Sequence, residues 1–199
     1  MAQLLFFDEK HSYTVDGVEL PAVSSILRFL SREVYSDINQ YTLDAAARRG
    51  TAVHEACEML DKYRRVECDD EYAPYLQAYI AFLKDYNVSW VDIEKRMFHK
   101  DKMYAGTIDR FGSVGGVSSL VDIKTSSVVQ KTVVKAQLNG YESMRICNGE
   151  TPAEVLYCLQ LMKTGKYRLY EVEKDSTEFD ACYNLHTALG RKHERGKIE

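Results

Sequence analysis

Tyr104-Ala-Gly-Thr-Ile-Asp-Arg-Phe111, followed by Leu120-Val-Asp-Ile-Lys-Thr125, is the stretch that decides the fold of this chain. Apolar and polar residues alternate along both runs, which is typical of β-strands. Gly115 and Gly116 lie between the runs, where a tight hairpin turn requires residues that accept a positive φ. We therefore predict that the two runs pair as antiparallel neighbours.

These two predicted strands carry charged side chains that can meet. Residues two apart on a strand project from the same face, so Asp122 and Lys124 point together, and Asp109 on the neighbouring strand can join them. Two carboxylates and an ammonium would then converge. An Asp-x-Lys pair alone is a weak signal, because charges alternate on many solvated strand faces. Its interpretation depends on the rest of the chain.

The composition is that of a globular protein. The chain has 199 residues, of which 45% are hydrophobic, and this predicts one domain over residues 1–199. Within it we expect an N-terminal hairpin and helix (1–30), a core that carries the motifs (44–147), and a C-terminal hairpin and helix (148–199). No apolar run is long enough to span a membrane, and the N-terminus lacks the basic flank of a signal peptide, which predicts a cytoplasmic protein with no membrane partner.

The cysteine content and the net charge bear on which classes of function are open to this protein. The five cysteines are scattered and form no Cys-x-x-Cys pair, which disfavours a disulfide framework and a zinc or iron–sulfur site. The net charge of −4 does not exclude a nucleic-acid enzyme. A metal-dependent nuclease needs clustered carboxylates, and its basic residues need only line one groove.

The N-terminal part predicts a β-hairpin followed by helices. Alternating runs flank Asp16-Gly17, a strong hairpin-turn signal, and Ser24 or Ser25 can cap the next helix. A helical pattern begins at Asp44, and Thr51 is predicted to be the N-cap of a second helix that carries His54 beside its apolar face.

The region 90–98 is predicted to be a strand that completes a three-stranded meander with the two opening runs. Glu94 lies on it and points either toward the carboxylates or into solvent. The region 128–147 is predicted to be a helix in which Gln137 and Tyr141 lie one turn apart. Asn139-Gly140 inside this helix costs about 1 kcal/mol relative to alanine, so another interaction must compensate. A hairpin (154–173), a terminal helix and a frayed tail from Arg191 follow.

Five motifs occur in order along the chain. They are Gly50-Thr-x-x-His54-Glu55, a strand with Glu94, Gly106-x-x-Asp109, Asp122-x-Lys124 and Gln137-x-x-x-Tyr141. This order resembles the PD-(D/E)XK nuclease superfamily, and within it the RecB-like and phage-exonuclease branch. The opening His11–Gly17 with Pro21 is similar to the leading hairpin of phage-type members.

The sequence departs from the family pattern at three points. No proline precedes Asp109, and Asp122 stands where many members have glutamate, but both carboxylates supply hard oxygen ligands. The cysteine quartet of some RecB-like relatives is missing, so we expect no iron–sulfur cluster.

The resemblance implies a restriction-endonuclease-like α/β fold, in which helices flank a central mixed β-sheet and a β-hairpin precedes it. It also implies that Mg²⁺ or Mn²⁺ is bound by His54, Asp109, Asp122 and the backbone carbonyl of Ile123. Lys124 would orient or deprotonate the attacking water and neutralise charge on the phosphorane.

Other residues receive supporting roles from the same resemblance. Gln137 and Tyr141 would position the substrate or Lys124. Glu94 and Glu58 are candidates for a second-shell or second-metal role. Four basic residues flank the motifs and are candidates for phosphate contacts: Arg48, Arg49, Lys131 and Lys135.

The function implied is that of a metal-dependent DNA exonuclease that leaves 5′-phosphates, in phage-type recombination or repair. The partners implied are DNA and a single-strand annealing protein, with subunits assembling as a homo-oligomer in a bacterial cell or phage-infected host. Two alternatives stay open: an endonuclease of the same fold, and a non-catalytic DNA-binding accessory protein. Filled acidic positions beside a lysine favour an enzyme.

Overall fold

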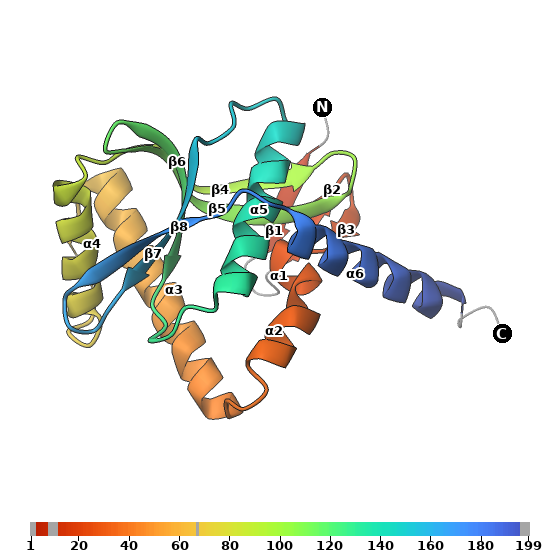
Figure 1. Ribbon diagram of the computed structural model, residues 1–199, viewed down its shortest axis with the longest axis horizontal. Helices are drawn as coiled ribbons and strands as arrows, with labels where there is room; N and C mark the ends of the chain where they lie inside the picture. Colours follow the sequence, from red (N-terminus) through yellow and green to blue (C-terminus); the bar gives the residue numbers. More distant parts are fainter. Residues whose placement is uncertain (1–2, 8–11, 67, 196–199) are drawn as a thin grey trace.

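The computed structural model describes residues 3–7, 12–66 and 68–195 (Figure 1). His11, which belongs to the predicted leading hairpin, lies outside these residues. No helix in the described ranges is long and apolar enough to cross a bilayer.

The N-terminal hairpin is confirmed and is part of a small antiparallel sheet. Its strands are β1 (Leu4–Phe7), β2 (Ser12–Val15) and β3 (Val18–Leu20), in the order β1-β2-β3. The turn between β2 and β3 has positive φ at both central residues, Asp16 (50°) and Gly17 (83°), which matches the twist of a hairpin.

The main sheet has five strands in the order β4-β5-β6-β7-β8. The strands are β4 (Ser89–His99), β5 (Tyr104–Val114), β6 (Val117–Lys124), β7 (Val155–Leu161) and β8 (Tyr167–Val172). Strands β6 and β7 are parallel and every other neighbouring pair is antiparallel. The predicted meander, C-terminal hairpin and mixed sheet flanked by helices are therefore confirmed.

Six helices are described. They are α1 (Val23–Ile26), α2 (Arg28–Val34), α3 (Gln40–Tyr63), α4 (Ala73–Asp85), α5 (Lys131–Cys147) and α6 (Thr177–Arg195). Helix α5 begins three residues later than the sequence pattern suggests. The parallel strands β6 and β7 are joined through α5, which is the usual crossover for such a pair.

Three expectations about helix ends are wrong. Thr51 is not an N-cap: α3 runs through it, its hydroxyl donates to the carbonyl of Ala47, and Asn39 caps the helix by accepting from the Thr42 amide. Ser24 and Ser25 lie inside α1, whose N-cap is Ala22, without a side-chain hydrogen bond.

The third concerns the chain end, since the predicted frayed tail is helical through Arg195. Lysine, arginine and glutamate are good helix formers, which accounts for this extension. Residues 196–199 of that tail lie outside the described part. The second half of α6 projects away from the rest of the molecule (Figure 1).

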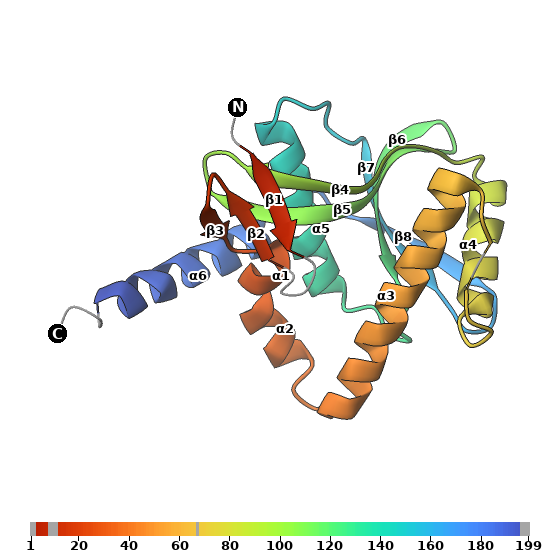
Figure 2. The ribbon, with the colours of Figure 1, turned by 180° about the vertical axis from the view of Figure 1, so that it is seen from behind.

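Helices cover both faces of the main sheet (Figures 1 and 2). On one face α5 buries Leu120, Leu138 and Leu156 with α1 and the start of α6, whereas on the other face α3 and α4 bury Val121 and Ile123. Consecutive residues of β6 thus enter opposite cores, as the period of two requires.

Gly140 shows what compensates for a glycine inside α5. A Cβ built there would lie 2.6 Å from the ring of Phe179, which is fully buried, and the hydroxyl of Tyr104 donates to the Gly140 carbonyl at 2.9 Å. The missing side chain therefore lets α6 pack closely on α5.

We predict that Gly140→Ala destabilises the protein by about 1–3 kcal/mol, because the added methyl overpacks this contact. Gly190→Ala in α6 is the matched control, because a Cβ there has no described neighbour within 4 Å, and alanine is the better helix former. Urea unfolding of both variants gives the comparison; equal stabilities would contradict the packing explanation.

Candidate active site

The residues of the five motifs gather around two adjoining cavities. An open cleft of about 650 Å³ is lined by residues of α3, β4, β5, α5 and the N-terminal sheet. A second cavity of about 310 Å³ contains Lys124 and Thr125. The two share Gly50, His54 and Gln137, so His54 and Gln137 stand at the boundary between them.

His54 lies on α3, and its imidazole is surrounded by oxygen atoms of other residues. Its Nε2 is 3.0 Å from the carbonyl oxygen of Ile123, and its Nδ1 is 3.4 Å from Glu94 Oε1 and 3.8 Å from Asp109 Oδ2. Burial alone would lower the pKa of His54, but the charge of Asp109 and the hydrogen bond with Glu94 outweigh it and raise the pKa to about 9.

Glu94 reaches this cluster through an irregular backbone. Its φ is +49° in the middle of β4, a conformation that costs a non-glycine residue about 1–3 kcal/mol. Opposite it on β5, Ile108 and Phe111 both pack toward the α5 core although they are three residues apart. Strand β5 therefore changes phase at Asp109, and Glu94 and Asp109 both face His54. Of the two orientations left open for Glu94, the structure has the one toward the carboxylates.

Asp109 lies where β5 and β6 separate. The paired register runs from Val114–Val117 and ends at Arg110–Val121. Beyond this point the carboxylate of Asp109 accepts a hydrogen bond from the Ile123 amide at 2.7 Å. Its Oδ2 lies 3.8 Å from His54 Nδ1 on α3, and its charge also acts on Asp122 and Lys124, so the two carboxylates and the ammonium lie near one another as expected.

Asp122 is almost completely buried and its carboxylate is only partly compensated. Its Oδ2 lies 2.7 Å from the Lys124 ammonium, whereas Oδ1 has no hydrogen-bond partner among the described residues. Burial raises the pKa of Asp122 to about 6, against the opposing effect of Lys124 and with a further increase from Asp109. Burial would lower the pKa of Lys124, but the charges of Asp122 and Asp109 raise it, so Lys124 carries a positive charge.

Lys124 begins a hydrogen-bonded chain to α5. Its ammonium donates to Gln137 Oε1 at 3.0 Å, and Gln137 Nε2 donates to the Tyr141 hydroxyl at 3.0 Å. Gly106 makes room for Tyr141, because a Cβ at Gly106 would lie 2.8 Å from the Tyr141 ring. The Gln-x-x-x-Tyr and Gly-x-x-Asp motifs are thus in direct contact.

The donor set fits a hard divalent cation. His54, Glu94 and Asp109 offer one nitrogen and two carboxylate oxygens that all lie within 4.8 Å of one another. The Ile123 carbonyl and the buried Asp122 Oδ1, which has no hydrogen-bond partner among the described residues, adjoin them. Carboxylate and carbonyl oxygens with one imidazole suit Mg²⁺ or Mn²⁺ better than a thiophilic metal.

The other predicted residues lie at different distances from this cluster. Glu58 lines the larger cleft, where its carboxylate pairs with Lys62 at 2.5 Å. Arg49 lines the smaller cavity and donates to Thr125 Oγ1 at 3.4 Å, whereas Arg48 is exposed on α3.

Lys131 and Lys135 are not brought to the cleft. They line a separate cavity with β8, and the Lys135 ammonium contacts three carboxylates, those of Glu173, Asp175 and Glu178. The packing of this end of α5 against β8 and α6 keeps them out of the cleft, and their role as phosphate contacts stays a prediction.

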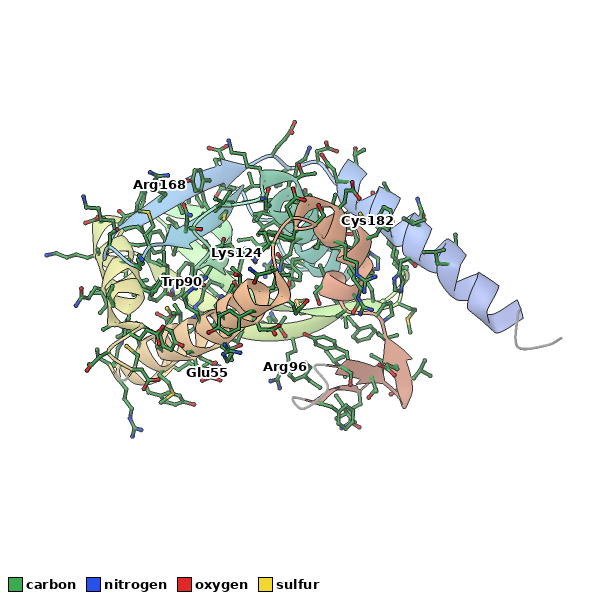
Figure 3. All side chains as sticks on the ribbon, turned by 90° about the horizontal axis from the view of Figure 1, so that it is seen from below. Glu55, Trp90, Arg96, Lys124, Arg168 and Cys182 are labelled. Carbon is green, nitrogen blue, oxygen red and sulfur yellow. The ribbon has the colours of Figure 1, made fainter. Side chains whose placement is uncertain are left out.

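Several residues in and behind the cleft were missed by sequence reasoning. Lys62 and Arg96 line the larger cleft, and Figure 3 shows Arg96 reaching from β4 toward the N-terminal sheet, while Lys124 lies between α3 and α5. Arg110 and Asp61 form a buried ion pair behind Glu94 at 2.7 Å. The position of Arg110 directly after Asp109 was the one available signal.

Comparison with known proteins gives distant structural similarity only. No protein-family model matches this sequence, and no curated protein matches it either. The chain is similar to an alkaline exonuclease, LHK-Exo, from Laribacter hongkongensis, with a TM-score of 0.43 and 14% identity over 90% of this chain and 95% of that one.

Two further solved structures are similar. The complex of LHK-Exo with dAMP has a TM-score of 0.44 and 15% identity, over 90% of this chain and 95% of that chain. The crystal structure of SSO0001 has a TM-score of 0.36 and 18% identity, over 58% of this chain and 56% of that chain.

The raised pKa of His54 predicts a pH-dependent stability. The folded chain holds a proton on His54 up to about pH 9, whereas the ordinary pKa of 6.5 applies after unfolding. Its contribution to stability is therefore complete below pH 6.5 and is lost as the pH rises through about 9. With a chelator present, the free energy of unfolding should fall more steeply between pH 6.5 and about 9 for the unchanged protein than for His54→Gln. Parallel pH profiles would show that the folded protein does not hold this proton.

Proposed function

We propose that this chain is a divalent-metal-dependent deoxyribonuclease of the PD-(D/E)XK type. The observation that carries the proposal is the buried carboxylate of Asp122 beside Lys124, next to the His54, Glu94 and Asp109 cluster in an open cleft. Buried charges without full compensation are costly, and sites of catalysis are where such arrangements concentrate.

The ligands proposed for Mg²⁺ or Mn²⁺ are His54, Asp109, Asp122 and the Ile123 carbonyl, with Glu94 as a further oxygen donor in the same cluster. When bound, such a cation supplies Lewis acidity toward a phosphate oxygen and lowers the pKa of a bound water. The carboxylate of Asp109 also accepts a hydrogen bond from the Ile123 amide. This bond holds the Asp109 carboxylate close to the Ile123 backbone, which supplies the carbonyl ligand.

Lys124 is proposed to act as a fixed positive charge. Its raised pKa favours orienting the water and neutralising the phosphorane over removing a proton. Gln137 holds the Lys124 ammonium and Tyr141 holds Gln137, so the pair positions the lysine from α5. Electrostatic stabilisation of this kind is usually the largest single contribution to catalysis.

The substrate proposed is DNA, and the action proposed is that of an exonuclease leaving 5′-phosphates in recombination or repair. Cationic side chains line both cavities: Lys62 and Arg96 in the larger, Arg49 and Lys124 in the smaller. They provide attraction for a phosphate backbone despite the net charge of −4. The proposals of a phage role, a homo-oligomer and an annealing partner rest only on the resemblance of the sequence motifs to those of phage-type exonucleases.

Digestion of end-labelled linear duplex beside a covalently closed circle of the same sequence tests this function, with Mg²⁺, with Mn²⁺ and with chelator. We expect metal-dependent loss of the linear DNA alone, and the label released first gives the polarity. Cleavage of the circle would indicate an endonuclease. If neither duplex nor single strands are cut, the accessory-protein alternative replaces the enzyme.

Lys124→Ala should reduce cleavage by at least about 100-fold, the cost of removing one electrostatic stabiliser of a transition state, while metal-dependent DNA binding persists. Asp109→Ala should abolish both metal binding and cleavage. Lys84→Ala, on the exposed surface of α4, controls for loss of a lysine elsewhere. Undiminished cutting by purified Asp109→Ala would refute the assignment of the site.

A further inference from the structure

Arg110 is a fully buried arginine directly behind the proposed metal site. Its Nη1 donates to Glu94 Oε1 at 2.9 Å and to the Asp109 carbonyl at 2.7 Å. Its Nε donates to Asp61 Oδ2 at 2.7 Å. One guanidinium therefore joins α3, through Asp61, to two residues of the cluster.

This arrangement is a poor way to stabilise a core. Arg110 Nη2 is buried and has no hydrogen-bond partner among the described residues, which is unfavourable for a buried donor. Buried ion pairs can often be replaced by apolar residues without loss of stability. The retention of charge at Arg110 therefore calls for a reason in the site itself.

Glu94 provides that reason. Its φ of +49° is strained within a strand, and its carboxylate also lies 3.4 Å from His54 Nδ1. The guanidinium of Arg110 holds Asp61 through Nε and, through Nη1, both Glu94 and the Asp109 carbonyl, a planar geometry that a lysine ammonium cannot reproduce.

A second layer fixes Arg110. The Tyr79 hydroxyl donates to Asp61 Oδ2 at 2.6 Å, and Trp90 Nε1 donates to the Tyr79 hydroxyl at 2.9 Å. Tyr79 on α4 is fully buried. The chain of contacts thus runs from Trp90 at the start of β4 through α4 and α3 to Arg110.

We propose that Arg110 is a positioning residue, which acts through Glu94 to hold the His54, Glu94 and Asp109 donors in the arrangement that binds the divalent cation. Asp61 and Tyr79 set the orientation of Arg110. This inference rests on the proposed function, because it assigns Arg110 to the same metal site.

The test is Mn²⁺ binding to the full chain without DNA, measured by titration calorimetry, beside urea unfolding in chelator. We expect Arg110→Lys and Asp61→Asn to weaken Mn²⁺ binding by about 10- to 100-fold, the usual effect of losing a partner of a metal ligand. Tyr79→Phe keeps the ring and removes the hydroxyl, and it should also weaken Mn²⁺ binding. This variant tests the proposal if the other two do not fold.

Arg145→Lys is the matched control. Arg145 is also buried, and it pairs with Asp92 at 3.2 Å and Glu150 at 2.7 Å, away from the cluster. It should lose stability and keep its Mn²⁺ affinity, which separates positioning from general destabilisation.

A double-mutant cycle identifies the path of the effect. If Arg110 acts through Glu94, the losses from Arg110→Lys and Glu94→Gln should not add. Full Mn²⁺ affinity in folded Arg110→Lys, Asp61→Asn and Tyr79→Phe, or fully additive losses, would overturn the positioning role alone. Absence of Mn²⁺ binding by the unchanged chain would instead overturn the proposed function, and this inference with it.

Discussion

The hydrogen bond from the Ile123 amide to the Asp109 carboxylate is the interaction on which the site depends. Strands β5 and β6 stop pairing at Arg110–Val121, and a buried amide beyond that point needs another acceptor. A side chain supplies it at 2.7 Å. The strands can therefore separate without an orphaned amide, and the opening between them is where α3 and α5 bring their polar residues together.

The two faces of the sheet contribute different chemistry at this opening. Helix α3 brings His54 to Glu94 and Asp109, a group rich in oxygen donors. Helix α5 brings Gln137 and Tyr141 to Lys124, a group that holds a positive charge. The side chains of Asp122 and Lys124 share one face of β6, and Lys124 contacts Gln137 of α5. The backbone of Ile123 between them contacts His54 and Asp109, so this short segment serves both groups.

Charge balance explains why so many ionisable groups are tolerated inside a small protein. The carboxylates of Asp61, Glu94 and Asp122 lie in contact with Arg110 or Lys124, and His54 adds a proton to the cluster. Each pair offsets part of the desolvation penalty of its members. Asp122 Oδ1, which has no hydrogen-bond partner among the described residues, lies where a divalent cation would complete the balance.

Local patterns along the chain were enough to predict the strands, two of their turns and the order of the motifs. Alternation of period two predicted the N-terminal hairpin and the meander, and Asp16-Gly17 and Gly115-Gly116 marked their turns, because these signals depend on neighbours along the chain. The convergence of His54 with the strand residues was available only from the resemblance of the motifs.

The remaining features of the site depend on contacts between segments that are far apart in the chain. The positive φ of Glu94 and the change of phase at Asp109 depend on contacts between strands, and the continuation of α3 through Thr51 depends on packing that overrides a local capping signal. Arg110 and Asp61 are 49 residues apart, and Lys135 was turned away from the cleft toward β8 by the packing of α5. Neither contact can be predicted from a periodic pattern in the sequence, because the partners that make burial of a charge possible come from distant parts of the chain.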